Sequence, residues 1–283
     1  MPVWITQLLY FLIVLVLLSV IWEVYKVFGA AVDYKIPGTE LILPLRPNDY
    51  NMPHVWDIVG ALFQPARRGG EVLIFILLRS ALFTWGEAVI GFLIGGGLGF
   101  GLGVLFAHSS LLERGLLPYV VASQTVPLLA IAPMVVIWLR DFASAWLAVS
   151  VIAAYLTFFP VTINTLRGLR SPSASAMELM HSYAATRSEI LWKLRVPAAL
   201  PYIFTALKVS ATASVVGAIV GELPSGIQQG LGRAILNFNQ YYLTNPSRLW
   251  AANIVASLVG ITFFLIIVGL ERAVVHQRPQ AEE

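Results

Sequence analysis

Six apolar runs, each of about twenty residues or more, constrain this chain more than any other feature of its sequence. They cover residues 3–28, 76–107, 115–139, 143–166, 202–222 and 247–271. At about 1.5 Å per helical residue, each run can cross a hydrocarbon layer about 30 Å thick. Backbone groups in lipid must be bonded internally, and these runs do not alternate as barrel strands would. The sequence therefore predicts an all-α integral membrane protein with about six transmembrane helices.

Composition agrees with a chain that lies mostly in lipid. Hydrophobic residues make up 58% of the chain and charged residues 12%, whereas a soluble domain carries about 25% charged residues. The absence of cysteine excludes disulfide bonds, thiolate chemistry and cysteine-ligated metals. The net charge of +3 fits basic loops at a membrane surface better than a nucleic-acid-binding surface.

The usual catalytic and nucleotide-binding motifs are missing from the sequence. It contains no G-x-x-x-x-G-K-[ST], no H-E-x-x-H and no G-x-S-x-G, which argues against a P-loop and against zinc or serine hydrolysis. The four histidines are too scattered to form a metal-ligand pair, so no metal site is expected. An intramembrane enzyme would need clustered polar residues, and Glu87, Gln124 and Asn164 lie in three different runs.

The chain divides into four regions by composition. Residues 1–28 are expected to be a retained first transmembrane helix, because no basic segment precedes the apolar run as it does in a signal peptide. Residues 29–75 are expected to form an extracytoplasmic loop with a short interfacial helix near 54–63, where apolar residues make one helical stripe. Residues 76–271 would form a core domain with five transmembrane helices, and residues 272–283 a cytoplasmic tail.

The second and third runs carry patterns that indicate close packing and a break. Small residues recur at every fourth position of the second run, which lets another helix backbone approach closely; they are Gly91, Gly95, Gly99 and Gly103. Packing within the subunit explains this row, and a subunit interface or a pore-lining groove is the open alternative. Two prolines, Pro127 and Pro133, interrupt the third run, so its helix is expected to be kinked or partly unwound.

Polar residues inside or beside the runs are candidates for a solute path, because broken helices at membrane depth often line a cavity. The candidate path residues are Gln124, Thr125, Asn164 and Glu222. For Asn164, a structural hydrogen bond is the simpler alternative. A carboxylate is costly in lipid, so Glu87 is expected to face protein or water.

The segment from Glu178 to Pro201 is too polar to lie in lipid, although apolar runs flank it. Basic residues concentrate in and around it, which by the positive-inside rule places it in the cytoplasm together with both termini. Within it, Glu178 is followed six residues later by Ala184, and after nine more residues by Leu194-Arg195-Val196-Pro197. A docking surface and an ordinary solvated loop are the two interpretations of such a segment.

This spacing resembles the EAA motif, E-A-A-x-x-G-x(9)-I-x-L-P, of the inner-membrane permease subunits of binding-protein-dependent ABC importers. The chain is similar in particular to the nitrate-, sulfonate- and taurine-type permeases, with a pyrimidine-precursor and riboflavin-like branch. The resemblance covers nearly the whole chain after about residue 55. It includes Gly91-Phe92, residues 125–138, residues 158–165 with Gly168, residues 197–203 and Gly230-Leu231-Gly232.

The resemblance implies a type I ABC importer permease fold with a cytoplasmic coupling helix pair within about residues 172–201. The residues that it assigns to coupling with the ATPase are Glu178, Ser182, Ala184, Ala185, Thr186, Arg187, Glu189, Leu194 and Pro197. It implies that this chain is no enzyme and binds no cofactor, with ATP and Mg on two separate ATPase subunits. A periplasmic or lipid-anchored binding protein, and a second permease copy or a paralogue, would complete the importer in the bacterial inner membrane.

Departures from the motif lead to two structural expectations. Alanine replaces the motif glycine at Ala184, and a left-handed backbone there would cost about 1–2 kcal/mol, so a helical or bridging conformation is expected. Pro197 and Pro201 are expected to stop the second helix of the pair and to set its angle to the fifth span.

The transported solute is weakly constrained by the sequence. Bound oxyanions favour arginine or helix N-termini, and the candidate path residues are not strongly cationic. Together with Glu87 and Glu222, this favours a small neutral heterocycle of pyrimidine or riboflavin type. Import of nitrate, taurine or alkanesulfonates is the alternative, and an intramembrane enzyme or a structural membrane anchor is the alternative of a different class.

Overall fold

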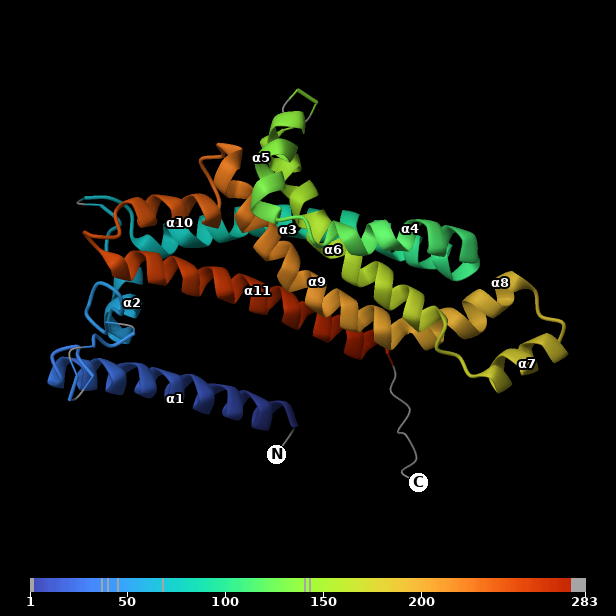
Figure 1. Cartoon of the computed structure of the whole chain (residues 1–283), viewed down its shortest axis with the longest axis horizontal. Helices are drawn as coiled ribbons and strands as arrows, with labels where there is room; N and C mark the ends of the chain where they lie inside the picture. Colours follow the sequence, from blue (N-terminus) through green and yellow to red (C-terminus); the bar gives the residue numbers. More distant parts are fainter. Residues whose placement is uncertain are drawn as a thin grey trace. The chain divides into compact units, whose positions relative to one another are not determined.

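The computed structural model describes residues 3–36, 38–39, 41–44, 46–67, 69–139, 141–142 and 144–275. Within these ranges the chain is almost entirely helical (Figure 1), and extended pairing is limited to two isolated bridges. The helices are α1 (Val3–Ala31), α2 (Val55–Leu62), α3 (Leu73–His108), α4 (Ser110–Ser123), α5 (Leu128–Leu139), α6 (Ala145–Leu169), α7 (Ala174–Ser182), α8 (Arg187–Glu189), a π-helical turn η1 (Ile190–Arg195), α9 (Val196–Ser225), α10 (Leu231–Gln240) and α11 (Pro246–Val274).

The prediction of about six membrane-spanning helices is confirmed. Five helical stretches of the described chain are long and apolar enough to cross a membrane, and the bent pair α4–α5 makes a sixth if it counts as one span. Their ends differ from the predicted ends by a few residues, except at the fifth span, which begins much earlier. Of the predicted cytoplasmic tail, residues 276–283 lie outside the described residues.

The predicted break in the third span is larger than a kink, because α4 and α5 meet at 102°. The chain turns at residues 124–127, and the carbonyl of Pro127 accepts the first hydrogen bonds of α5. Pro133 lies inside α5 without ending it. The hydroxyl of Tyr155 on α6 donates to the carbonyl of Ser123, so a neighbouring helix satisfies a backbone group that the break leaves open.

The chain groups into two compact units, which differ from a simple division near residue 75. The first unit holds Met1–Leu77 with Ile235–Ile254, and the second holds Leu78–Ala234 with Val255–Glu283. In the first unit, α2 confirms the helix predicted near residues 54–63. Two polar contacts join it to α1: the Val55 amide donates to Glu23 Oε1 at 2.9 Å, and His54 Nδ1 lies 2.7 Å from Glu23 Oε2.

In the second unit, α6 is packed closely between α3 and α9. A Cβ added at any of the four glycines spaced four apart on α3 would lie less than 3 Å from an atom of α6; they are Gly91, Gly95, Gly99 and Gly103. On the opposite side, a Cβ at Gly217 of α9 would lie 2.8 Å from the Cα of Ala153. Ala153, which also faces Gly91, is therefore enclosed by both neighbours. The glycine row thus serves packing within this unit.

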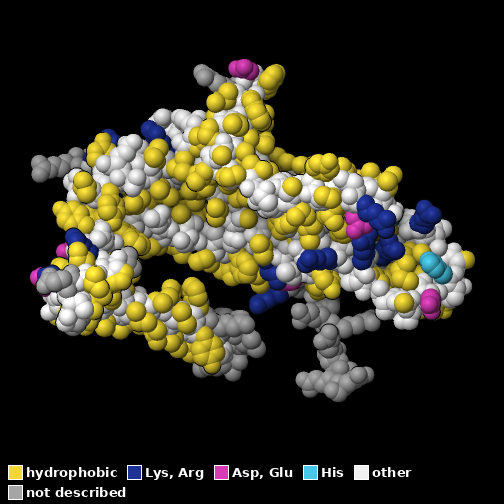
Figure 2. All heavy atoms as spheres, in the orientation of Figure 1, with side chains coloured by type: hydrophobic (Ala, Val, Ile, Leu, Met, Phe, Trp, Pro, Cys, Tyr) yellow, Lys and Arg dark blue, Asp and Glu magenta, His cyan; other side chains and the backbone are white. Residues whose placement is uncertain are grey.

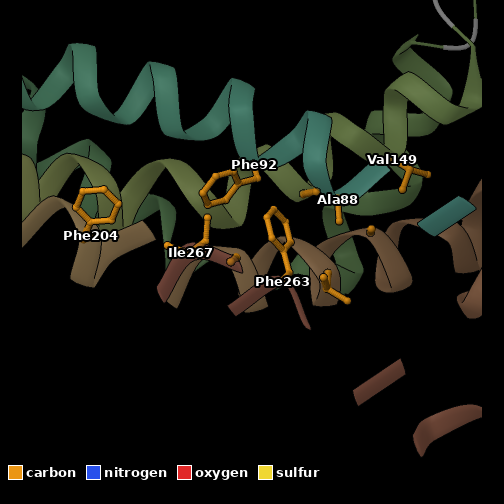
Figure 3. Close-up of a cluster of buried hydrophobic side chains, with 10 residues drawn as sticks. Ala88, Phe92, Val149, Phe204, Phe263 and Ile267 are labelled. Atoms are coloured by element: carbon orange, nitrogen blue, oxygen red, sulfur yellow. The ribbon is translucent and has the colours of Figure 1, made fainter. Parts of the chain in front are cut away.

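Large side chains fill the space beside this glycine contact. Phe92 of α3 and Phe263 of α11 pack with their ring centroids 5.0 Å apart, and Ile267 and Phe204 extend the cluster (Figure 3). Small residues on one face of α3 and aromatic residues on another thus let the same helix contact α6 directly and α11 through its side chains.

Candidate functional site

The polar segment after α6 begins with a short exposed helix. Ser173 caps α7, because its hydroxyl oxygen accepts from the Ala176 amide at 3.3 Å. None of the residues of α7 is buried, and Glu178 and Ser182 are exposed. The helix therefore packs little against the rest of the chain, and most of its surface is exposed.

The end of α7 has the hydrogen bonds of a Schellman motif. The Ala184 amide donates to the His181 carbonyl at 2.9 Å, and the Ala185 amide donates to the Met180 carbonyl at 3.0 Å. This closure needs a left-handed residue between the two helices, and Ala184 has φ 52°. The expectation of a helical or bridging backbone at Ala184 is therefore wrong. The closing hydrogen bonds fix the conformation, and the alanine bears the steric cost that glycine would avoid.

Replacing Ala184 by glycine should therefore stabilise this turn. We expect Ala184→Gly to raise the free energy of unfolding by about 1 kcal/mol, because the Cβ strain of the left-handed backbone is removed. Thermal unfolding of the purified protein and hydrogen exchange across residues 180–187 would measure the effect. The matched change Ala176→Gly, inside α7, should destabilise by about 1 kcal/mol, and equal effects at the two sites would contradict the left-handed assignment.

A capping box starts the next helix directly after this turn. The Glu189 amide donates to Thr186 Oγ1 at 3.3 Å, and the Thr186 amide donates back to Glu189 Oε2 at 2.9 Å. Glu189 also accepts from Lys193 Nζ at 2.9 Å. Thr186 and Glu189, which the resemblance assigned to coupling, thus fix the geometry of the turn between α7 and α8.

Removing this cap should loosen the start of the helix. We expect Thr186→Ala to cost about 1 kcal/mol locally, since the Glu189 amide loses the hydroxyl oxygen that accepts its hydrogen bond. Faster hydrogen exchange at the amides of residues 186–190 would report the loss. Ser188→Ala is the control, because Ser188 is exposed and lies outside the capping box, and a similar loss of protection in that variant would contradict the prediction.

The second half of the segment continues into the fifth span without a stop. Residues Arg187–Ser225 form one helical stretch of 39 residues. The expectation that Pro197 and Pro201 end a separate helix is therefore wrong. The π-helical turn before Pro197 is the physical reason: the Val196 amide donates to the Leu191 carbonyl, and this widened turn accommodates a ring that would clash with the carbonyl four residues earlier.

Close contacts join the ends of this segment to the membrane helices. A Cβ at Gly168 of α6 would lie 2.9 Å from the Cα of Ala199 on α9, so the two backbones nearly touch where the segment leaves and returns. Arg170 pairs with Glu113 of α4 through both guanidinium nitrogens, at 2.7 Å for Nη1. The ends of the segment are thus in contact with α6, α9 and α4.

The exposed face of the segment carries apolar side chains that sequence reasoning missed. Leu179 is 56% exposed and Tyr183 77% exposed, and Trp192 is exposed on η1. Basic side chains gather at the same end of the unit (Figure 2). Of the residues assigned to coupling, the exposed ones are Glu178, Ser182, Ala184, Thr186, Arg187 and Pro197, and the half-buried ones are Ala185, Glu189 and Leu194. The spacing of Leu179 and Tyr183, four residues apart in a polar segment, was the available signal.

Comparison with known proteins identifies the family. Residues 95–276, more than half of the chain, match the family described as "Binding-protein-dependent transport system inner membrane component". The chain belongs to this family. It is a multi-pass permease subunit of an ABC importer in the bacterial inner membrane.

The permease is similar to transporters for several solutes. It is 36% identical to the formylaminopyrimidine transport permease protein ThiX of Halalkalibacterium halodurans over 202 residues, 69% of this chain and 78% of that protein. It is 30% identical to the riboflavin transport system permease protein RibX of Chloroflexus aurantiacus over 200 residues, 71% of this chain and 72% of that protein. Further relatives are named as permeases for aliphatic sulfonates and for nitrate.

The fold of the permease is that of a type I importer. A chain of the MetNI methionine ABC transporter, in an inward-facing crystal form, superposes with a TM-score of 0.61 at 17% identity, over 73% of this chain and all of that chain. The polar segment described above, from Ser173 to Arg195, lies wholly within the region that matches the family.

The candidate path residues of the permease lie in different environments. Gln124 and Thr125 are exposed at the bend between α4 and α5, and Thr125 Oγ1 donates to the Ala122 carbonyl at 2.7 Å. Asn164 is half-buried, and its Nδ2 donates to the Pro160 carbonyl of its own helix at 2.8 Å. Glu222 is enclosed in protein at 1% exposure. Glu87 is fully buried, as expected for a carboxyl group at membrane depth.

Proposed function

We propose that this permease imports a small nitrogen heterocycle, and that the exposed segment from Ser173 to Arg195, here called the coupling segment, receives the motion of an ATPase subunit. The observation that supports the coupling role most strongly is that the helix runs without a break from the coupling segment into the membrane. The coupling segment leads into an unbroken helix of 39 residues that contains the whole fifth span. A push on one end of such a helix reaches membrane depth without an intervening hinge.

The exposed apolar side chains suit this docking role. Interfaces are centred on aromatic and apolar anchors surrounded by charged groups. Leu179 and Tyr183 offer such anchors, and Arg187 of the same segment is also exposed. The small side chains of Ser182, Ala184 and Ala185 leave room for a partner surface. The rigid Schellman turn and capping box would hold the anchors in one geometry and lower the entropic cost of binding.

The complete importer would contain partners for each remaining step. Two ATPase subunits would bind ATP and Mg, since this chain has no P-loop. A second permease copy or a paralogue would form the other half of the path, and a binding protein would deliver solute at the outer face. Alternating access would follow from rocking of the packed helices, with the exposed residues Gln124 and Thr125 and the half-buried Asn164 as candidate contacts for the solute.

The choice of a heterocycle rests on the relatives. Glu87 and Glu222 are enclosed in protein, so the sequence argument that used them does not bear on the solute. Similarity to permeases named for formylaminopyrimidine and riboflavin supports a nitrogen heterocycle. Nitrate, taurine or an alkanesulfonate remains the alternative, which the sulfonate and nitrate permeases among the relatives support.

Purification of the tagged chain from its native membrane tests the assembly. We expect a P-loop ATPase to co-purify in stoichiometric amount, with hydrolysis that a binding protein stimulates. A folded chain that purifies alone would overturn the coupling role and would favour the anchor or enzyme interpretation. Uptake into vesicles that contain the purified complex then tests the solute: inhibition by unlabelled formylaminopyrimidine or riboflavin is expected, and inhibition by nitrate or taurine alone would overturn the heterocycle proposal.

A further inference from the structure

Two carboxyl groups from different helices meet inside the second unit, away from the coupling segment. Glu87 on α3 is 0% exposed and Glu222 on α9 is 1% exposed. Thr84, three residues before Glu87 on α3, lies 2.5 Å from Glu222 Oε1, so the two carboxyl groups are close neighbours. Burying two acidic groups next to each other costs free energy, so neighbouring hydrogen-bond donors or bound protons must offset that cost.

Hydrogen bonds from neighbouring parts of the chain offset the cost of burying Glu222. Thr84 Oγ1 donates to Glu222 Oε1 at 2.5 Å, and the Leu231 amide donates to the same Thr84 oxygen at 2.8 Å. The Gly232 amide donates to the other oxygen, Glu222 Oε2. The hydrogen bonds therefore run from the start of α10 through α3 to α9, and they hold the turn between α9 and α10 against the carboxyl group.

Glycine is required where this turn crosses Glu222. Gly230 has φ +96°, and a Cβ there would lie 2.4 Å from both carboxyl oxygens of Glu222. At Gly232 a Cβ would lie 2.3 Å from the Ile219 carbonyl. The backbone of the turn is thus packed directly on the Glu222 carboxyl group.

No such hydrogen bonds offset the burial of Glu87. Both of its oxygens are buried, and neither receives a hydrogen bond from a neighbouring donor. An ionised carboxylate only accepts hydrogen bonds, so two ionised groups here would repel without a donor between them. Three groups around the pair form hydrogen bonds, and all three bind Glu222. They are the Thr84 hydroxyl of α3 and the amides of Gly232 and Arg233 at the start of α10.

We propose that Glu87 and Glu222 hold one proton between them, and that this proton keeps the Gly226–Gly232 turn closed on α9. A protonated carboxyl is the donor that the site lacks, and it removes the repulsion without needing any space. Loss of the proton would leave two adjacent negative charges, which separate most easily by release of the turn. This proton latch is independent of the solute and of the ATPase.

Infrared spectroscopy of the intact permease in lipid nanodiscs tests the shared proton directly. At neutral pH we expect a carboxylic C=O stretching band that shifts in deuterium oxide. The band should vanish in Glu87→Gln and in Glu222→Gln but persist in Glu178→Gln, whose carboxyl is exposed. Absence of the band in the native protein, or its persistence in both buried-site variants, would overturn the proposal.

The absence of cysteine allows a second test by thiol labelling. Leu231 is fully buried under the turn, whereas Gln228 is exposed on it. The labelling rate of Leu231→Cys, divided by that of Gln228→Cys, should rise about tenfold per pH unit as long as the closed state holds the proton, because one proton leaves per opening. In the Glu87→Gln background the ratio should be constant, since the amide is a permanent donor. The same pH dependence in that background, or a dependence on Na⁺ in place of pH, would overturn the latch.

Discussion

A leucine in place of Gly95 is expected to prevent the permease from folding, while the same change two residues later is tolerated. A Cβ at Gly95 would lie 2.4 Å from the Ala154 carbonyl oxygen and 2.7 Å from the Thr157 Cβ. Both obstacles belong to α6, which is held from the other side by α9, so it has no room to retreat. Overpacking of this kind costs about 1–3 kcal/mol when the core can adjust, and we expect about 3 kcal/mol or more here.

Gly97→Leu is the matched control for this prediction. Gly97 is exposed, and a Cβ there would meet nothing within 4 Å. Replacing a helical glycine also gains up to about 1 kcal/mol in helix propensity. The yield of monodisperse protein in size-exclusion chromatography and the midpoint of thermal unfolding would compare the variants. Equal behaviour of Gly95→Leu and Gly97→Leu would contradict the close contact between α3 and α6.

Arginine in place of Tyr183 is expected to detach the ATPase subunit without harming the permease fold. Tyr183 is 77% exposed at the tip of the coupling segment, so the substitution removes no buried contact. If Tyr183 anchors the partner, loss of its ring costs at least about 2 kcal/mol, which corresponds to roughly thirtyfold weaker binding. Titration of the purified ATPase onto the permease in nanodiscs would give the dissociation constant.

Tyr241→Arg provides the same change at an exposed tyrosine outside the coupling segment. Tyr241 is 64% exposed and follows α10. We expect its affinity for the ATPase to match that of the native chain, and both variants to unfold at the native temperature. If Tyr183→Arg binds the ATPase with native affinity, the partner does not use this face and the coupling proposal loses its main anchor.

Patterns that depend on local physics were readable from the sequence. The length and apolarity of the runs predicted the spans, because lipid accepts a backbone only when its hydrogen bonds are internal. The four-residue spacing of Gly95 and Gly99 indicated a close helix contact. The sequence could not name the partner helix, because any helix with small residues would have satisfied the pattern.

Features that depend on cooperation between neighbouring residues were not readable. At Ala184 the propensity of one residue argued against a left-handed backbone, but two closing hydrogen bonds and the following cap outweigh it. At Pro197 the rule that proline ends a helix failed, because a π-helical turn before it absorbs the ring. The sequence predicted Glu222 as a path residue, and only the return of the chain at Gly230 and Gly232 shows why it is enclosed.

The pairing of Glu87 with Glu222 has a consequence for the biogenesis of the permease. The two residues are separated by 135 positions, and a ribosome adds about 5–20 residues per second. Glu87 therefore waits on the order of ten seconds, with α3 already made, before its partner is synthesised. During that interval the carboxyl group must stay protonated or remain in the aqueous part of the insertion machinery. The second span is thus expected to leave the translocon late, together with α9, and not when its own synthesis ends.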